Sequence, residues 1–435
     1  MITPYQHLVE LNVSPKANYR CLELSPNGCL VAAITVNSVE IWSFQSNISR
    51  LSSFQQSRPS GYSKALLNRL FVLWKSDSKR FVVIRSEGIV DFYEVGFKQK
   101  IVEDVYEEAY APLGCVSATL NKVCSIAIEQ FGYPISACTL NDKILIATDS
   151  NQIVELNWNG ECIGFPLSRF VSSIQYEYTN QKIMSISSCS YLSCLAIALD
   201  DNTCLLLDLP SSSHFPITGM IIPSNNQDGI RQVLFCPGLP LLAITSSRLS
   251  IDFYQIHKNS IDEKEVVEST EPVKSVEPEE STEFTQSTTT QPFQAIHHHS
   301  IDIRQYPQIN SSPLYAYDSI ISMCWAPGKP YLVTGLKYQG LMVWSVDGEM
   351  LYAYNSISSN TITSQEMNLS QTVEVSCCCF SLDSTRLLFS IPYDEIHQDN
   401  QENVITILSH LCYQQFMVTT DIIHSLFLFF SFSYV

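Results

Sequence analysis

The stretch MCWAPGKPYLVTGLKYQGLMVWSVDG, residues 323–348, decides the fold. Its first apolar run ends in Trp325 and is followed by the turn Ala326-Pro327-Gly328. A second apolar run leads to a polar tip at Tyr338-Gln339-Gly340, and a third run ends in Trp344-Ser345. Because Gly, Pro and Asn favour backbone reversal, the pattern predicts three short antiparallel strands joined by two turns.

Six other stretches of the chain repeat this order: residues 21–44, 69–95, 134–158, 183–209, 231–256 and 375–409. Each has an apolar strand, a polar turn, a second strand, a short tip and a third strand that ends in an aromatic or acidic residue. Unrelated hairpins in a β-sandwich are the competing interpretation, but they do not explain the recurring order. We therefore predict an all-β fold, a β-propeller of about seven four-stranded blades. The fourth strand of each blade is expected in the variable connections.

The predicted propeller is WD-repeat-like and covers residues 1–410. WD repeats end their third strand in Trp-Asp, and this position holds Trp42-Ser43, Phe92-Tyr93 and Trp344-Ser345 here. Residues 258–300 form a predicted disordered insertion within the propeller, because they are rich in Glu, Ser, Thr and Pro. Its Ser and Thr are either a solvated surface or phosphorylation sites.

An apolar tail, residues 411–435, follows the propeller. Its run DIIHSLFLFFSFSYV is shorter than the roughly 20 residues that span a membrane. We expect a buried strand whose continuation is missing. A tail anchor and a truncated or mistranslated end are the alternatives.

Composition sets the broad class. The chain has 435 residues, of which 45% are hydrophobic, and a formal net charge of −18. An acidic surface repels phosphate backbones, so we expect no nucleic-acid partner. The 15 Cys lie mostly in apolar runs without a Cys-x-x-Cys pair, and the N-terminus shows no secretory signal. These features indicate reduced thiols in a cytoplasmic protein.

The sequence offers no catalytic constellation. We find no phosphate-binding loop, no nucleophile elbow and no zinc-protease helix motif. The run His297-His298-His299 lacks partners at metal-ligand spacing, and Cys377-Cys378-Cys379 fits a buried strand whose thiols alternate between faces. Adjacent acids such as Asp200-Asp201 are expected in solvated tips. We therefore predict no enzyme activity and assign no catalytic, cofactor-binding or metal site and no cofactor.

One blade resembles a known family. Gln305-Tyr306-Pro307, Trp325-Ala326-Pro327, Tyr338-Gln339-Gly340-Leu341 and Trp344-Ser345-Val346 with Gly348 are similar to the large propeller subunit of the Ric–Rgp complex. Residues 74–95 and 144–161 also resemble blades of that family. The resemblance covers most of the chain before the tail. Family members are longer and continue into a helical C-terminal region, so the match is to their N-terminal part.

The resemblance implies a function without covalent chemistry. The family subunit acts with an Rgp-type partner subunit as a guanine-nucleotide exchange factor for a Golgi Rab GTPase in retrograde endosome-to-Golgi transport. A chain of this kind is expected in the cytoplasm, peripheral at Golgi membranes through its complex. The alternative is a generic propeller scaffold in a coat or tethering complex. The resemblance supplies no exchange residue for these blades.

Overall fold

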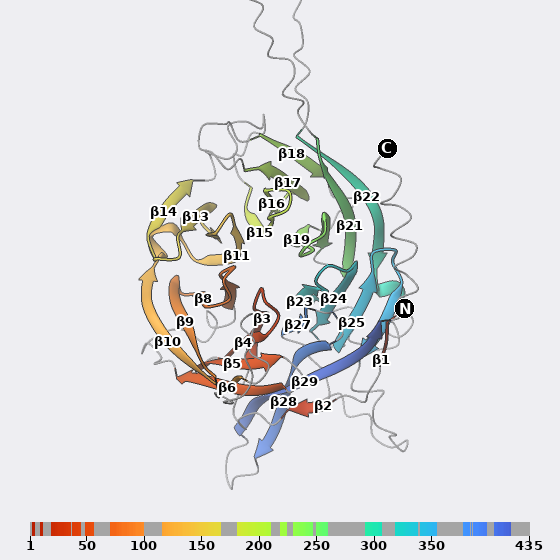
Figure 1. The fold of residues 1–435 in the computed structure, drawn as a ribbon. Helices are drawn as coiled ribbons and strands as arrows, with labels where there is room; N and C mark the ends of the chain where they lie inside the picture. Colours follow the sequence, from red (N-terminus) through yellow and green to blue (C-terminus); the bar gives the residue numbers. More distant parts are fainter. Residues whose placement is uncertain are drawn as a thin grey trace, which may run out of the picture.

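The computed structural model describes residues 2–4, 9–11, 19–35, 37–44, 48–55, 70–99, 115–166, 181–209, 218–223, 229–246, 249–259, 292–306, 318–337, 340–354, 377–382, 384, 386–397 and 404–418. Almost all of these residues lie in β-strands or their turns. The strands form separate antiparallel sheets that stand around a common centre, which is the arrangement of a β-propeller (Figure 1).

Six sheets are regular blades, in which four consecutive strands pair from the innermost to the outermost. Blade 1 holds β3 (Tyr19–Leu24), β4 (Leu30–Thr35), β5 (Ser38–Phe44) and β6 (Ile48–Gln55). Blade 2 holds β7 (Leu70–Trp74), β8 (Arg80–Arg85), β9 (Ile89–Gln99) and β10 (Cys115–Ala127). Blade 3 holds β11 (Pro134–Leu140), β12 (Lys143–Thr148), β13 (Gln152–Leu156) and β14 (Cys162–Pro166).

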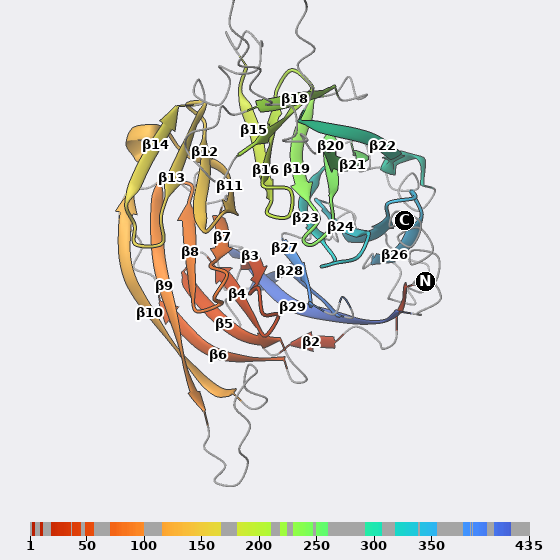
Figure 2. The same ribbon diagram turned by 45° about the horizontal axis from the view of Figure 1, so that its top comes forward.

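The second half of the ring repeats this plan, as the tilted view shows (Figure 2). Blade 4 holds β15 (Ile183–Cys189), β16 (Cys194–Leu199), β17 (Thr203–Asp208) and β18 (Thr218–Pro223). Blade 5 holds β19 (Ile230–Phe235), β20 (Leu241–Ser246), β21 (Ser250–Lys258) and β22 (Phe293–Asp302). Blade 6 holds β23 (Ile320–Trp325), β24 (Tyr331–Leu336), β25 (Gly340–Ser345) and β26 (Met350–Tyr354).

The seventh sheet joins the two ends of the chain. Its inner strands are β27 (Cys377–Phe380), β28 (Arg386–His397) and β29 (Val404–Val418). The N-terminal strands β1 (Ile2–Pro4) and β2 (Val9–Leu11) both pair antiparallel with β29. This pairing closes the ring with backbone hydrogen bonds between residues that are about 400 positions apart in sequence.

Strands on the inner layers are apolar at nearly every position because both faces of each blade are buried. On β16 alternate side chains go to opposite sides. Leu195, Ile197 and Leu199 belong to the cluster shared with blade 3. Cys194, Ala196 and Ala198 belong to the cluster shared with blade 5. The larger side chains thus fill one seam and the smaller ones fill the other.

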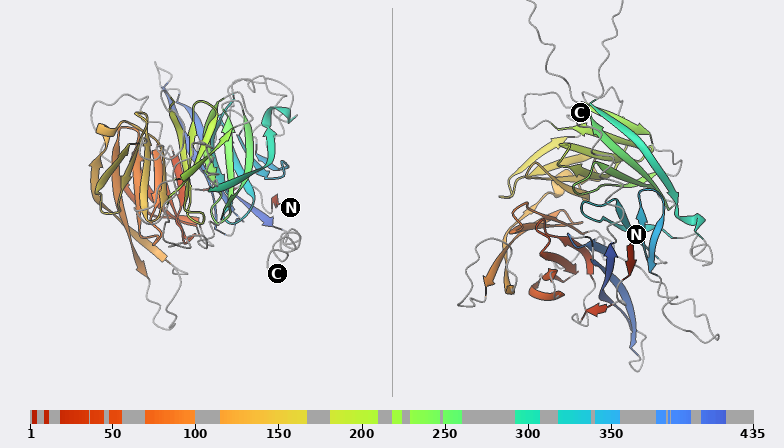
Figure 3. Two further views of the ribbon diagram at one scale, coloured as in Figure 1. Left: turned by 90° about the horizontal axis from the view of Figure 1, so that it is seen from above. Right: turned by 45° about the vertical axis from the view of Figure 1, so that its right-hand side comes forward.

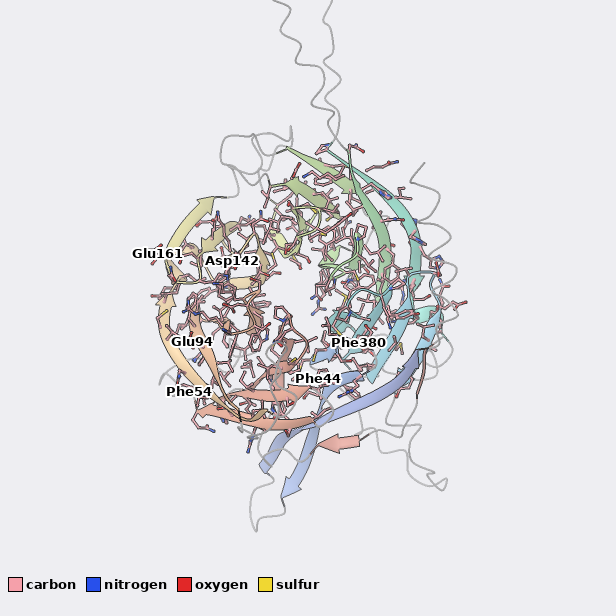
Figure 4. All side chains as sticks on the ribbon, viewed as in Figure 1. Phe44, Phe54, Glu94, Asp142, Glu161 and Phe380 are labelled. Carbon is pink, nitrogen blue, oxygen red and sulfur yellow. The ribbon has the colours of Figure 1, made fainter. Side chains whose placement is uncertain are left out.

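The described residues form seven apolar clusters, and each cluster fills the seam between two neighbouring sheets. The last seam joins the seventh sheet to blade 1, where Cys377, Cys379 and Leu388 pack with Tyr19 and Leu22. The innermost strands touch their neighbours all the way round the ring. Side chains therefore fill the spaces between the sheets (Figure 4).

The predicted repeat is confirmed. Each of the seven predicted units contains the first three strands of one sheet, and the fourth strand of the six regular blades lies in the connection that follows. The sequence did not reveal that β1 and β2 complete the last sheet. Two three-residue strands carry too little periodicity to be recognised before their partner is known.

Two predicted boundaries are wrong. Residues 293–300 were expected in the disordered insertion 258–300, but they belong to β22, which pairs with β21 from Lys258 to Ser250. As an outer strand β22 carries exposed polar residues, so its apolar signal is weak. The tail was expected to begin at residue 411, but β29 runs through that position to Val418. Residues 260–291 and 419–435 lie outside the described part of the chain.

Trp325 provides a test of the seams. Its Nε1–H donates a 2.9 Å hydrogen bond to the Leu234 carbonyl oxygen of blade 5, and its ring packs on Phe253. Trp325→Phe removes this donor from a buried seam, so we expect a loss of about 1–3 kcal/mol in the free energy of unfolding. Urea unfolding followed by far-UV circular dichroism measures the loss.

Trp158→Phe is the matched control. Trp158 is also buried, but its Nε1 finds no hydrogen-bond partner among the described residues. The control therefore loses ring area without losing a hydrogen bond. Equal losses in the two variants would contradict the role of the Trp325 bond.

Candidate interaction surface

One face of the propeller is built from the turns between the first and second strands, because all innermost strands run in the same direction. We call it the turn face. It comprises residues 25–29, 75–79, 141–142, 190–193, 236–240, 326–330, 381–382 and 384. Figure 3 shows the sheets from the side, so that the two faces of the ring can be compared.

The turns of this face are tied to one another across the seams. The Asn27 N–H donates to Ser78 Oγ at 3.0 Å, and the Gly328 N–H donates to the Pro237 carbonyl oxygen at 2.9 Å. The Ser384 hydroxyl donates to the Pro327 carbonyl oxygen at 3.1 Å. These joined turns are therefore held in place, and a partner that binds them would cause little further loss of conformational freedom.

Gly28 shows how closely these turns approach. It has a φ of +72°, and a Cβ added there would lie 2.5 Å from Leu382 Cβ. A side chain at this position is excluded both by the left-handed backbone and by the neighbouring turn. The contact fixes Leu382 at the seam between the seventh sheet and blade 1.

The turn face carries exposed apolar side chains on several of its turns. Tyr191 is 78% exposed and Leu382 is 50% exposed, and Pro26 and Pro237 are exposed as well. Protein interfaces are enriched in aromatic residues and depleted in Lys and Glu. We therefore take the turn face as the candidate interaction surface. Val123, which is 57% exposed, lies on the outer strand β10 instead.

Several acidic residues of the opposite face accept hydrogen bonds close to its turns. Asp149 Oδ1 accepts from the Tyr133 N–H, and Asp200 Oδ1 accepts from the Lys182 N–H. Asp201 accepts from Gln181 and from the Thr203 hydroxyl. The prediction that Asp200-Asp201 lie in a tip is confirmed, and their bonds cap local backbone.

The two runs weighed for metal chemistry are separated in the fold. Cys377, Cys378 and Cys379 lie buried in β27, and the middle thiol packs toward blade 6 while the others pack toward blade 1, as predicted. His297, His298 and His299 lie exposed on β22, where His297 Nε2 is 2.9 Å from Ser300 Oγ. The described residues contain no group of three or more His, Cys, Asp or Glu that could hold a metal ion.

The inner strands place a carboxyl group among thiols. Glu23 of β3 lies near three thiols, those of Cys21, Cys324 and Cys379. Burial is the main cause that raises the pKa of each thiol, and the negative charge of Glu23 raises it further. Partial desolvation at the inner strands raises the pKa of Glu23 to about 8. The side chain still has surface exposed to solvent, so screening limits how far this shift changes the folding free energy.

Comparison with known proteins identifies the fold. No family model and no curated protein sequence matches the chain. Solved structures do match. The WD40 repeats of RRP9 give a TM-score of 0.55 at 10% identity, over 96% of this chain and 100% of that chain. The β-propeller domain of Myceliophteria thermophila Cps50 (Swd1) gives 0.55 at 10% identity, over 95% and 99%.

A larger protein also matches. Raptor from Chaetomium thermophilum gives a TM-score of 0.53 at 12% identity over 94% of this chain, which spans 29% of the length of Raptor. No helix in the described ranges is long and apolar enough to cross a membrane. At these identities the similarity concerns the fold alone, which is that of a WD40 β-propeller.

Glu23 yields a prediction about pH. Its pKa in the fold, about 8, lies above its ordinary value of 4.5. The fold therefore favours the protonated carboxyl, and this contribution is complete below about pH 4.5 and is lost as the pH rises through about 8. The melting temperature of the wild-type chain minus that of Glu23→Gln should therefore decrease as the pH rises from about 5 to about 9.

The control is Glu129→Gln, which changes an exposed carboxylate outside the inner strands. The difference in melting temperature between this control and the wild type should stay constant over the same pH range. A constant difference for Glu23→Gln as well would show that the enclosure of Glu23 does not penalise its charge.

Proposed function

We propose that this chain is the propeller subunit of a guanine-nucleotide exchange factor complex that activates a Golgi Rab GTPase in retrograde endosome-to-Golgi transport. Its propeller serves as a protein-interaction platform for an Rgp-type partner subunit and for the GTPase. The proposal includes a cytoplasmic location, peripheral at Golgi membranes through the complex, and involves no enzyme chemistry, cofactor or nucleic acid.

The observation that carries the proposal is the packing of the residues that resemble the Ric–Rgp family. The Tyr306 ring meets the Trp344 ring edge-on, with centroids 4.9 Å apart, and the Tyr306 hydroxyl donates to the Gly348 carbonyl oxygen at 2.8 Å. Tyr306, which is about 40 residues from Trp344 and Gly348 in sequence, thus packs with them in one unit of blade 6. Pro307, Tyr338 and Gln339 lie outside the described residues.

These contacts also show what the resembling residues do. Trp344 Nε1–H donates to Thr334 Oγ1 at 3.0 Å inside blade 6, and Trp325 joins blade 6 to blade 5. They are structural residues of the blade, so their similarity supports a shared architecture. The surface that would meet a partner has to be sought elsewhere, and the turn face is the best-formed candidate.

Exchange itself requires no acid–base group. An exchange factor binds the nucleotide-free GTPase more tightly than the loaded form, and this difference in affinity shifts the GTPase toward nucleotide release. A propeller with exposed apolar side chains on its turn face can present such a binding surface. A generic scaffold in a coat or tethering complex uses the same fold, and the two functions differ in the partner that binds.

Binding to the partner subunit is the first test. Tyr191→Ser and Leu382→Ser together remove the two largest exposed apolar side chains of the turn face. We expect the pair to weaken capture of the Rgp-type partner at least about tenfold, because exposed aromatic anchors dominate interface energies. Surface-immobilised partner and purified chain give the dissociation constant.

Val123→Ser is the matched control, since it removes an exposed apolar side chain from the outer strand β10. It should leave the affinity unchanged. Loss of binding in the control but not in the turn-face variant would show that the partner binds the outer strands of the ring and not the turn face.

Nucleotide exchange is the second test. We expect this chain alone to leave the release of a fluorescent guanine nucleotide from a Golgi Rab unchanged. The chain with its Rgp-type partner is expected to accelerate release, provided that residues 1–435 contain the surfaces that both proteins need. Binding of both proteins without acceleration would favour the scaffold function, and failure to bind either would overturn the proposal.

A further inference from the structure

Two cysteines of blade 4 face each other across a hairpin. Cys189 ends β15, Cys194 begins β16, and the two residues are direct partners in the antiparallel register. Opposed residues in such ladders have Cα atoms about 4.5–5.5 Å apart, and disulfides span about 4.4–6.8 Å. Both thiols are free, and each one shifts the pKa of the other.

The surroundings shift the pKa values of the two thiols in opposite directions. The neighbouring Cys194 thiol and the backbone of Leu192 and Tyr191 lower the pKa of Cys189, against the effect of its burial. The neighbouring Cys189 thiol and burial raise the pKa of Cys194. Of the two sulfurs, Cys189 is therefore the one that forms a thiolate more readily.

Charged and titratable neighbours come from three other strands or turns. Asp208 of β17 is the ladder partner of Cys194, and Lys258 of β21 lies 2.7 Å from Asp208 Oδ1 and 3.4 Å from the Leu192 carbonyl oxygen. Cys236, at the corresponding turn of blade 5, lies close to Cys189. The two thiols of blade 4 thus have the Asp208–Lys258 ion pair beside Cys194 and the Cys236 thiol close to Cys189.

Other described thiols lack this combination. Burial raises the pKa of Cys138 and of Cys204 to about 12. Cys324 also has a second thiol beside it, that of Cys378 across the seam between blade 6 and the seventh sheet, but burial and this neighbour raise its pKa. Cys189 combines a lowered pKa with a second thiol directly opposite it in the ladder.

We propose that Cys189 and Cys194 form a redox modification site, in which a hydroperoxide oxidises Cys189 and Cys194 resolves the product into an intra-hairpin disulfide. The Cys189 thiolate attacks the peroxide, the O–O bond breaks, and Cys189 becomes a sulfenic acid while an alcohol or water leaves. The Cys194 sulfur then displaces the sulfenyl oxygen, which takes up the thiol proton and departs as water. Two electrons pass from the two sulfurs to the peroxide.

Access runs through the turn that joins the two strands. Cys189 is 5% exposed and Cys194 is fully buried, but the turn between them has only four residues and its second residue, Tyr191, is exposed. Short turns open locally at a small fraction of the global unfolding free energy. The disulfide would fix this turn, which belongs to the turn face, so oxidation state and the geometry around Tyr191 are coupled.

The test treats the reduced full-length chain with hydrogen peroxide and maps the peptide that contains residues 183–209 by mass spectrometry. We expect the loss of two hydrogens within this peptide and a Cys189–Cys194 link. The rate should rise about tenfold between pH 6 and pH 8, following the thiolate of Cys189. Cys194→Ser should stop the reaction at a Cys189 sulfenic acid that dimedone traps.

Cys204→Ser is the matched control, because Cys204 is fully buried in the same blade and should not affect the link. The wild-type map needs no variant, so a folding defect in Cys194→Ser does not remove the test. The proposal is overturned if Cys189 stays reduced at peroxide concentrations that oxidise partly exposed thiols such as Cys29. A Cys189–Cys236 link would overturn it too.

Discussion

No blade of this protein can bury both of its faces alone, and the structure depends on that constraint. A four-stranded sheet with apolar side chains on both faces requires a neighbour on each side. β16 illustrates the point, because its alternate residues enter two different seams. Seven such seams leave no exposed apolar face at either end of the row, provided that the row closes into a ring.

Closure is achieved at two levels. Backbone pairing of β1 and β2 with β29 joins the chain ends, so the ring cannot open without breaking ladder hydrogen bonds. Side-chain packing of Cys377 and Cys379 on Tyr19 and Leu22 fills the same seam. Buried thiols suit this place because they act as small apolar side chains where inner strands crowd together. The cysteine-rich character of the chain thus follows in part from the geometry of the ring.

The features open to function are those left over after the seams are filled. Tyr191 and Leu382 are exposed on turns of the same face, and the turn of Leu382 is held by the bond from Ser384 to Pro327. On the opposite face, Asp149 and Asp200 accept hydrogen bonds from backbone N–H groups of other segments. The thiol pair of blade 4 flanks the turn that carries Tyr191, which connects the proposed redox site to the proposed interaction surface.

The sequence alone determined the local plan. The apolar runs and turns of the stretch 323–348 and its six counterparts predicted the first three strands of every sheet, and the run Cys377-Cys378-Cys379 predicted a buried strand. Period-2 patterning and turn chemistry are encoded within about 25 consecutive residues, so they can be recognised without a partner.

Tertiary structure decided everything that depends on distant residues. The strands β1 and β2, the true extent of β22 and β29, the enclosure of Glu23 and the exposure of Tyr191 were not predictable from the sequence pattern. An outer strand is recognised by the ladder it joins, and a pKa or an exposed fraction depends on which other segments surround the group. The opposition of Cys189 and Cys194 also required the ladder register, because a shift of one residue turns each side chain to the other face of the sheet.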